Sequence, residues 1–172
     1  MLAYEATART KGYSIIAGVD EAGRGPLAGP VVAAAVLLAP GSQLDGLDDS
    51  KKLSPKIREK FFLIIKEQAL SYGIGIVGVE EIDKINILQA SLLAMKFAVE
   101  DLSDKPNLLL IDGNQRIDTE INQWTIVKGD SLSQSIAAAS VLAKVTRDKL
   151  MEQYHEQFPQ YAFDKHKGYG TR

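Results

Sequence analysis

The chain of 172 residues contains no cysteine, only two histidines and a single tryptophan. The absence of cysteine excludes disulfides and thiolate zinc sites. Two histidines, His155 and His166, argue against a histidine-rich metal centre. Any bound metal would therefore be held by oxygen ligands, which suit Mg²⁺, Mn²⁺ and Ca²⁺.

Long hydrophobic runs are also missing. The longest apolar stretch, 31–40, is far shorter than the roughly 20 residues that a membrane-spanning helix needs. The first twelve residues include Glu5, Arg9 and Lys11 and lack the apolar segment of a signal peptide. We therefore expect a cytoplasmic protein without membrane association, and we expect it to act as a monomer.

Neither sign of charge dominates the chain. Twenty Lys and Arg residues against 22 Asp and Glu residues give a net charge of −2, which argues weakly against a nucleic-acid partner. If four of the acids belong to a metal site, removing their four negative charges from −2 leaves +2 for the rest of the chain. The length and the apolar content of 45% fit a single globular domain with a sizeable core.

The apolar pattern predicts an α/β fold. Strands are expected over 13–19, 30–38, 72–79, 107–111 and 121–127. A helix should begin at Ser54-Pro55, a second should cover 85–102, and a buried third should open at Asp130 and run to about Tyr154. Three early strands followed by alternating helices and strands predict a mixed sheet whose first, fourth and fifth strands are parallel.

Four acids stand where predicted elements begin or end: Asp20, Glu21, Asp112 and Asp130. If the first and fourth strands pair in parallel, Asp20 and Asp112 lie side by side at the carboxyl edge of the sheet, where open α/β sheets place their sites. Successive strand residues point to opposite faces, so Glu21 joins Asp20 only if the strand ends or bulges there. Such a cluster would suit two cations that act on a phosphodiester.

Each acid also has a structural interpretation. Asp112 precedes Gly113 and could be a turn residue, and Asp130 could be the N-cap of the following helix. The pair Asp20-Glu21 is harder to explain structurally, because burying two charges at a strand end costs free energy that a purely structural role does not offset.

Six segments resemble the signatures of the ribonuclease HII family and occur in the family's order. They are Gly18–Pro26, Asp49–Ser54, Ile111–Asn114, Val127–Asp130, Ser140–Asp148 and His166–Thr171. The resemblance implies a ribonuclease H-like fold, a five-stranded mixed sheet flanked by helices, as one catalytic domain over 1–172. Family members usually continue with a helical tail, so we expect this chain to lack that part.

The resemblance also implies an activity: an endonuclease that cleaves RNA in RNA–DNA hybrids and cuts 5′ to ribonucleotides embedded in duplex DNA. It implies Mn²⁺ or Mg²⁺ as cofactor and products with 5′-phosphate and 3′-hydroxyl ends. The family's catalytic, metal-binding positions fall on Asp20, Glu21, Asp112 and Asp130.

The family's substrate-binding positions fall on Gly23, Arg24, Gly25, Lys51 and Tyr169. The first three form the loop that reads the ribose 2′-hydroxyl, Lys51 would contact a phosphate, and Tyr169 would pack on the adjacent deoxyribose. Glycine backbone can approach a 2′-hydroxyl without an intervening side chain. Alternatively, Arg24 could pair with an acid, Lys51 could be a solvated loop residue and Tyr169 could belong to a core.

Two other functions compete with this one. A DNA nuclease of the same fold would not need the Gly-Arg-Gly loop. A hybrid-binding module without catalysis would not need four acids, since carboxylates repel phosphate unless cations neutralise them.

Overall fold

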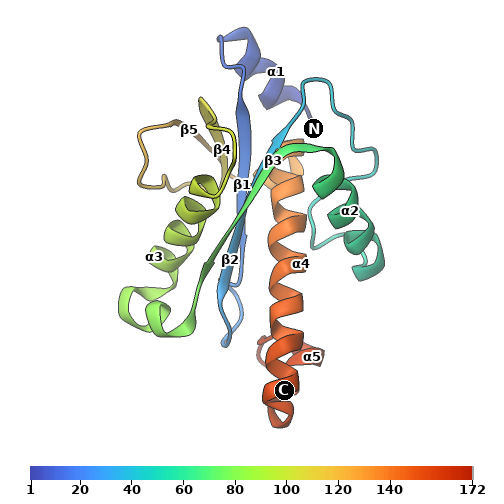
Figure 1. Cartoon of the computed structure of the whole chain (residues 1–172), viewed down its shortest axis with the longest axis vertical. Coiled ribbons are helices and arrows are strands. Elements are labelled where there is room, and N and C mark those ends of the chain that lie inside the picture. The colour runs from blue at the N-terminus through green and yellow to red at the C-terminus, as the bar shows by residue number, and fades with distance from the viewer. Residues whose placement is uncertain (172) are drawn as a thin grey trace.

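A computed structural model describes residues 1–171, and β1 lies at the centre of its five-stranded sheet (Figure 1). The strands follow the order β3-β2-β1-β4-β5. Their bounds are β1 Ile16–Ala22, β2 Val31–Leu38, β3 Ala69–Val77, β4 Leu108–Asp112 and β5 Asn122–Ile126. β1 pairs antiparallel with β2 and parallel with β4, and β4 pairs parallel with β5. The predicted mixed sheet, with its first, fourth and fifth strands parallel, is confirmed.

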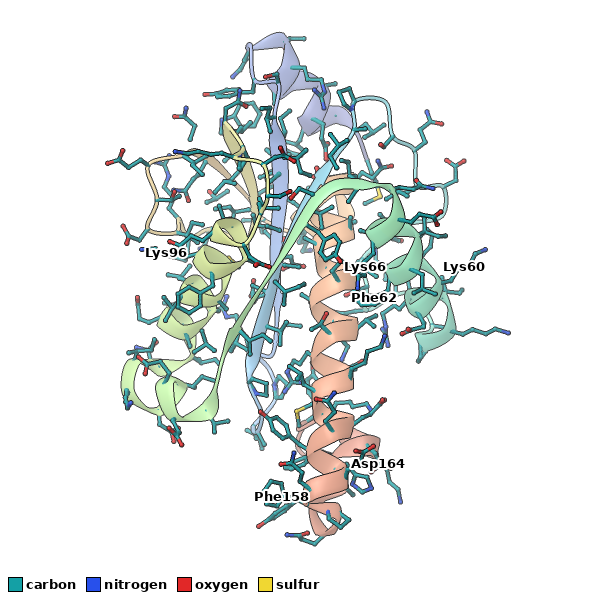
Figure 2. All side chains as sticks on the ribbon, viewed as in Figure 1. Lys60, Phe62, Lys66, Lys96, Phe158 and Asp164 are labelled. Carbon is teal, nitrogen blue, oxygen red and sulfur yellow. The ribbon has the colours of Figure 1, made fainter. Side chains whose placement is uncertain are left out.

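Helices cover both faces of the sheet. α3 (Val79–Glu100) packs on one face, and α2 (Pro55–Gln68) and α4 (Gln134–Gln157) pack on the other (Figure 1). The small alanines of β2 allow helices to pack closely on both faces of the sheet. Ala33 packs with the α3 layer and Ala34 with the α4 layer. Charged side chains such as Lys60 on α2 and Lys96 on α3 point outward from these layers (Figure 2).

The helix starts follow from local capping. The Ser54 hydroxyl accepts a hydrogen bond from Ile57 N, and Pro55 occupies the first turn of α2, as predicted. α3 begins earlier than predicted, at Val79, and is interrupted at Asn86, whose φ is 72°.

Two short helices were not predicted: α1 (Ala3–Thr10) and α5 (Phe163–His166). None of the helices within residues 1–171 combines the length and apolar composition that crossing a lipid bilayer requires.

The helix predicted to open at Asp130 begins later, and this prediction was wrong. Lys128 is left-handed, with φ 58°, and a short 3₁₀ turn, η1 (Gly129–Ser131), follows it. α4 then starts at Gln134 with Ser133 as N-cap, its hydroxyl accepting from Ile136 N. Asp130 therefore is not a helix cap, and its carboxylate is free for another role.

Candidate active site

Three of the four predicted acids meet at one edge of the sheet. The last residue pair of the parallel β1–β4 ladder is Val19 with Ile111, so Asp20 and Asp112 follow it side by side. Asp130 approaches from η1, and one carboxylate oxygen from each of the three acids lies within 4.8 Å of the others. The predicted meeting of Asp20 and Asp112 follows directly from the parallel register.

Asp112 also fixes the turn that carries Asp130. Its Oδ1 accepts a hydrogen bond from Gly129 N at 2.6 Å and a longer one from Asp130 N at 3.4 Å. One carboxylate thus has two tasks: it belongs to the acid cluster and it positions a second member.

The start of α4, just after Asp130, is held by the N-terminal helix. Glu5 Oε1 accepts hydrogen bonds from Ser133 Oγ at 2.7 Å and Ser135 N at 3.0 Å, and it also contacts Ser135 Oγ. A carboxylate at a helix N-terminus complements the positive end of the helix dipole. Sequence reasoning missed Glu5, because nothing local connects it to a helix far along the chain.

The cluster is electrostatically unfavourable without a cation. Burial raises the pKa of Asp20 well above its usual value, and the charges of Glu21 and Asp112 raise it further. Burial and the carboxylates of Asp112 and Asp49 raise the pKa of Asp130 to about 6. Crowded, desolvated carboxylates of this kind are the oxygen donor set that a hard divalent cation prefers.

Glu21 lies beside the cluster but outside it. The strand does not end at Val19: β1 stays paired with β2 through Ala22, with Glu21 opposite Ala33 on the α3 side of the sheet. Asp20 instead lies opposite Ala34, on the α4 side. Burial raises the pKa of Glu21, whereas Arg24, with Nη1 3.6 Å from Oε1, opposes that rise. The buried Oε2 has no hydrogen-bond partner among residues 1–171.

Lys51 interacts electrostatically with all three acids of the cluster. Burial opposes its charge, but the carboxylates of Asp20, Asp49 and Asp130 outweigh that effect and raise its pKa. Asp49 was missed by sequence reasoning, although it lies in the same motif. It accepts a hydrogen bond from Lys51 N at 2.9 Å and shapes the loop between β2 and α2.

The remaining predicted residues form one surface next to the acids. Gly23 has φ 115°, which glycine tolerates best, and a Cβ on Gly25 would lie 3.4 Å from the ring of Tyr169. Tyr169 is 46% exposed and so is not a core residue. Lys144 Nζ lies 5.6 Å from the centre of its ring. The glycine loop and this aromatic ring, predicted from distant motifs, are neighbours.

A five-stranded mixed sheet whose parallel strand ends carry clustered carboxylates fits a metal-dependent phosphodiester hydrolase of the ribonuclease H fold. The family model described as Ribonuclease HII matches residues 17–172. The chain is 60% identical to the ribonuclease HII of Syntrophus aciditrophicus (strain SB), over 98% of this chain and 80% of that protein. It is 54% identical to the ribonuclease HII of Bacillus subtilis (strain 168), over 100% of this chain and 67% of that protein.

Among solved structures, the ribonuclease H2 of Pyrococcus horikoshii OT3 superposes with a TM-score of 0.77 at 27% identity, covering 91% of this chain and 81% of that one. The chain therefore belongs to the ribonuclease HII family. It is a nuclease, a hydrolase that depends on divalent metal ions and cleaves RNA in RNA–DNA hybrids.

The raised pKa values of Asp20 and Asp130 predict how the stability of the metal-free protein depends on pH. A carboxyl whose pKa is higher in the folded protein binds its proton more tightly there than in the unfolded chain, where it titrates near about 4. In EDTA, the melting temperature should therefore fall as the pH rises from about 4 through the folded pKa of Asp130, about 6. Thermal scans in EDTA at a series of pH values measure this.

The double variant Asp20→Asn/Asp130→Asn is the reference for that scan, since every other titrating group remains in place. Its melting temperature should fall less over the same pH range. Equal pH dependence in the variant and the parent protein would show that the cluster does not carry this repulsion.

Proposed function

We propose that this chain cuts 5′ to ribonucleotides embedded in duplex DNA, as well as within longer RNA–DNA hybrids, and leaves 5′-phosphate and 3′-hydroxyl ends. The observation that carries the proposal is the proximity of two features. The acid cluster, with oxygens within 4.8 Å of one another, includes Asp20 on β1, and β1 leads into the glycine loop beside Tyr169. A site that cleaves next to a 2′-hydroxyl needs both a phosphodiester-hydrolysing centre and a nearby reader of the sugar.

Asp20, Asp112 and Asp130 would hold Mn²⁺ or Mg²⁺, and Glu21 would add its negative charge to the metal site from the opposite face of the sheet. The chemistry that two such cations would supply at these carboxylates is activation of a water and stabilisation of the departing 3′-oxygen. The protein's own contribution is positioning: Asp112 fixes the 3₁₀ turn through Gly129 N, and the capped start of α4 keeps Asp130 in place. Lys51 supplies a positive charge at the cluster, where a scissile phosphate would lie.

Substrate recognition would come from Gly23, Arg24 and Gly25 together with Tyr169. The bare backbone at the two glycines can approach a 2′-hydroxyl, which both donates and accepts hydrogen bonds. Tyr169 offers a half-exposed aromatic face to the adjacent sugar. The proposed site needs no residue from a second copy of the protein, and we propose that the chain acts as a monomer.

Cleavage of three matched duplexes tests this function: one with a single ribonucleotide, one with a continuous RNA strand and one of DNA alone. With Mn²⁺ present, we expect cuts 5′ to the single ribonucleotide and no cleavage of the all-DNA duplex. The variant Arg24→Ala should lower the preference for the single ribonucleotide. Cleavage of the all-DNA duplex would indicate a DNA nuclease, and binding of hybrid without metal-dependent cleavage would indicate a binding module.

A further inference from the structure

Arg147 is a buried cation that forms no ion pair with the acid cluster. It lies on α4 within the motif Ser140–Asp148, and its side chain is only 1% exposed. No carboxylate among residues 1–171 lies within ion-pair distance of it, since its neighbour Asp148 pairs with Lys144 instead. An arginine buried without an acid partner is costly unless its donors are satisfied in another way.

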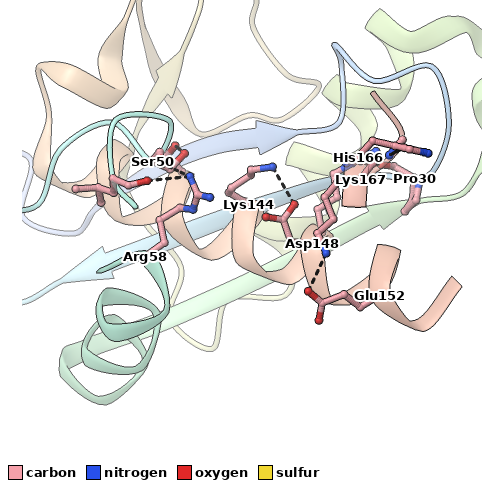
Figure 3. Close-up of polar contacts among 12 residues, drawn as sticks. Pro30, Ser50, Arg58, Lys144, Asp148, Glu152, His166 and Lys167 are labelled. Carbon is pink, nitrogen blue, oxygen red and sulfur yellow. Dashed lines mark hydrogen bonds and ion pairs between the residues drawn. The ribbon is translucent and has the colours of Figure 1, made fainter. Parts of the chain in front are cut away.

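Three backbone carbonyls satisfy this guanidinium. Nε donates to Pro30 O at 3.0 Å, Nη2 to Ala28 O at 2.8 Å and Nη1 to Lys167 O at 2.8 Å. Pro30 and Lys167 lie close together in the view of Figure 3, although they come from opposite ends of the chain. The first two carbonyls follow the glycine loop, and the third stands two residues before Tyr169.

The same two segments are also bonded directly to each other. Leu27 N and Ala28 N both donate to Gly168 O, at 2.8 and 3.2 Å. Gly168 has φ 87°, and a Cβ there would overlap the carbonyl oxygen of Ala28. The two loops therefore touch backbone to backbone, with the guanidinium of Arg147 beneath them.

There is little room around the guanidinium. A Cβ added to Gly23 would lie 2.8 Å from Nε, and one added to Gly29 would lie 3.1 Å from Nη2. Arginine's donors have a fixed planar arrangement, so they can bind three carbonyls in fixed relative directions, which a lysine ammonium on a flexible stem does not reproduce.

We propose that Arg147 is a positioning residue that sets the distance between the glycine loop Gly23–Gly25 and Tyr169, and thereby the grip on the sugars at a ribonucleotide junction. The inference rests on the proposed function, in which these two segments contact the substrate. Arg147 itself touches neither substrate nor metal. Its role is to hold two loops that are distant in sequence together, so that they form one substrate-binding surface.

The variant Arg147→Lys tests this proposal, because it keeps the positive charge and removes the planar guanidinium that donates to three carbonyls. Hydrogen exchange of the Leu27 and Ala28 amides should become at least about tenfold faster, as expected for losing a hydrogen bond to a charged group. KM for the duplex with one ribonucleotide should rise by about tenfold or more, for the same lost contact. The melting-temperature rise that Mn²⁺ causes should not change, since the acid cluster is intact.

Met95→Ala is the matched control, since Met95 is buried in the α3 layer on the opposite face of the sheet. It should lower the melting temperature yet leave the exchange of Leu27 and Ala28 and the substrate preference as they are. Unchanged amide exchange and an unchanged KM in Arg147→Lys would overturn the proposal, and so would an equal rise of KM in Met95→Ala.

If Arg147→Lys does not fold, Gly168→Ala decides, because its Cβ would overlap the carbonyl oxygen of Ala28 and lie 3.3 Å from Arg147 Nη2, and so forces apart the two loops that Arg147 joins. It should give the same loss of protection and the same rise in KM, and normal behaviour would overturn the proposal. Should the parent protein fail to cut at single ribonucleotides, the proposed function fails, but the amide exchange still decides whether Arg147 joins the loops.

Discussion

Replacing Asp112 with asparagine should lower turnover of an RNA–DNA hybrid by more than about 100-fold, since changing even an outer-shell partner of a metal site commonly costs 10- to 100-fold. The fold should survive. The Oδ1 of Asp112 accepts hydrogen bonds from Gly129 N and Asp130 N, and an asparagine carbonyl oxygen can accept the same two bonds. What the variant loses is one negative charge from three clustered carboxylates.

Two measurements separate loss of metal binding from loss of structure. In EDTA, the variant should melt at or above the temperature of the parent protein, because one repulsive charge is gone. With Mn²⁺, the parent should gain about 2.7 kcal/mol at 100 times its dissociation constant, and the variant should gain much less at the same concentration.

Asp118→Asn is the matched control for this change. The Asp118 side chain is 93% exposed and pairs with Lys96 on α3, away from the cluster. It should keep both its turnover and its Mn²⁺ response. Turnover near that of the parent in Asp112→Asn would contradict the assignment of the metal site.

Gly18→Ala should destabilise the protein by about 3 kcal/mol or more, the upper range for forcing extra atoms into a packed interior. Gly18 lies in β1 where α4 begins, and a Cβ there would overlap backbone atoms of Ser135 and Ile136. Neither β1 nor the start of α4 can shift easily to make room for the methyl group. β1 is paired with both of its neighbours, and the start of α4 is bonded to Glu5.

Urea unfolding measures the loss, and Gly78→Ala is its control. No atom lies within 4 Å of a Cβ built on Gly78, and its φ of −76° suits any residue. Gly78→Ala should therefore cost far less than Gly18→Ala. Equal losses of unfolding free energy in the two variants would mean that the close approach of α4 to β1 does not require glycine at position 18.

The meeting of Asp20 and Asp112 could be predicted from the sequence, because parallel register alone brings the ends of two neighbouring strands together. The face taken by Glu21 could not. It depends on whether β1 stops at Val19 or continues, and pairing with β2 keeps it extended through Ala22. Period-2 alternation then turns Glu21 away from Asp20, while the local sequence of glycines suggested an earlier end.

Other parts of the site were hidden for a different reason. The segment Gly-Asp-Ser-Leu-Ser contains two residues that could cap the following helix, Asp130 and Ser133. The left-handed conformation of Lys128 and the hydrogen bond from Gly129 N to Asp112 determine that Ser133 is the cap. Glu5 and Arg147 act on backbone groups far away in the chain. Although Arg147 lies within the motif Ser140–Asp148, nothing in the sequence names the partners of these two side chains, because any carbonyl or amide can be the partner.

The contact between Glu5 and Ser133, 128 residues apart, has a consequence for how the enzyme is made. α1 and β1 leave the ribosome well before Asp130 and the start of α4, which lie more than 100 residues further along the chain. Up to that point Glu5 has no partner, and one face of the sheet has no α4 to cover it. The cluster of Asp20, Asp112 and Asp130 is therefore complete only late in synthesis, after both ends of the domain are available to each other.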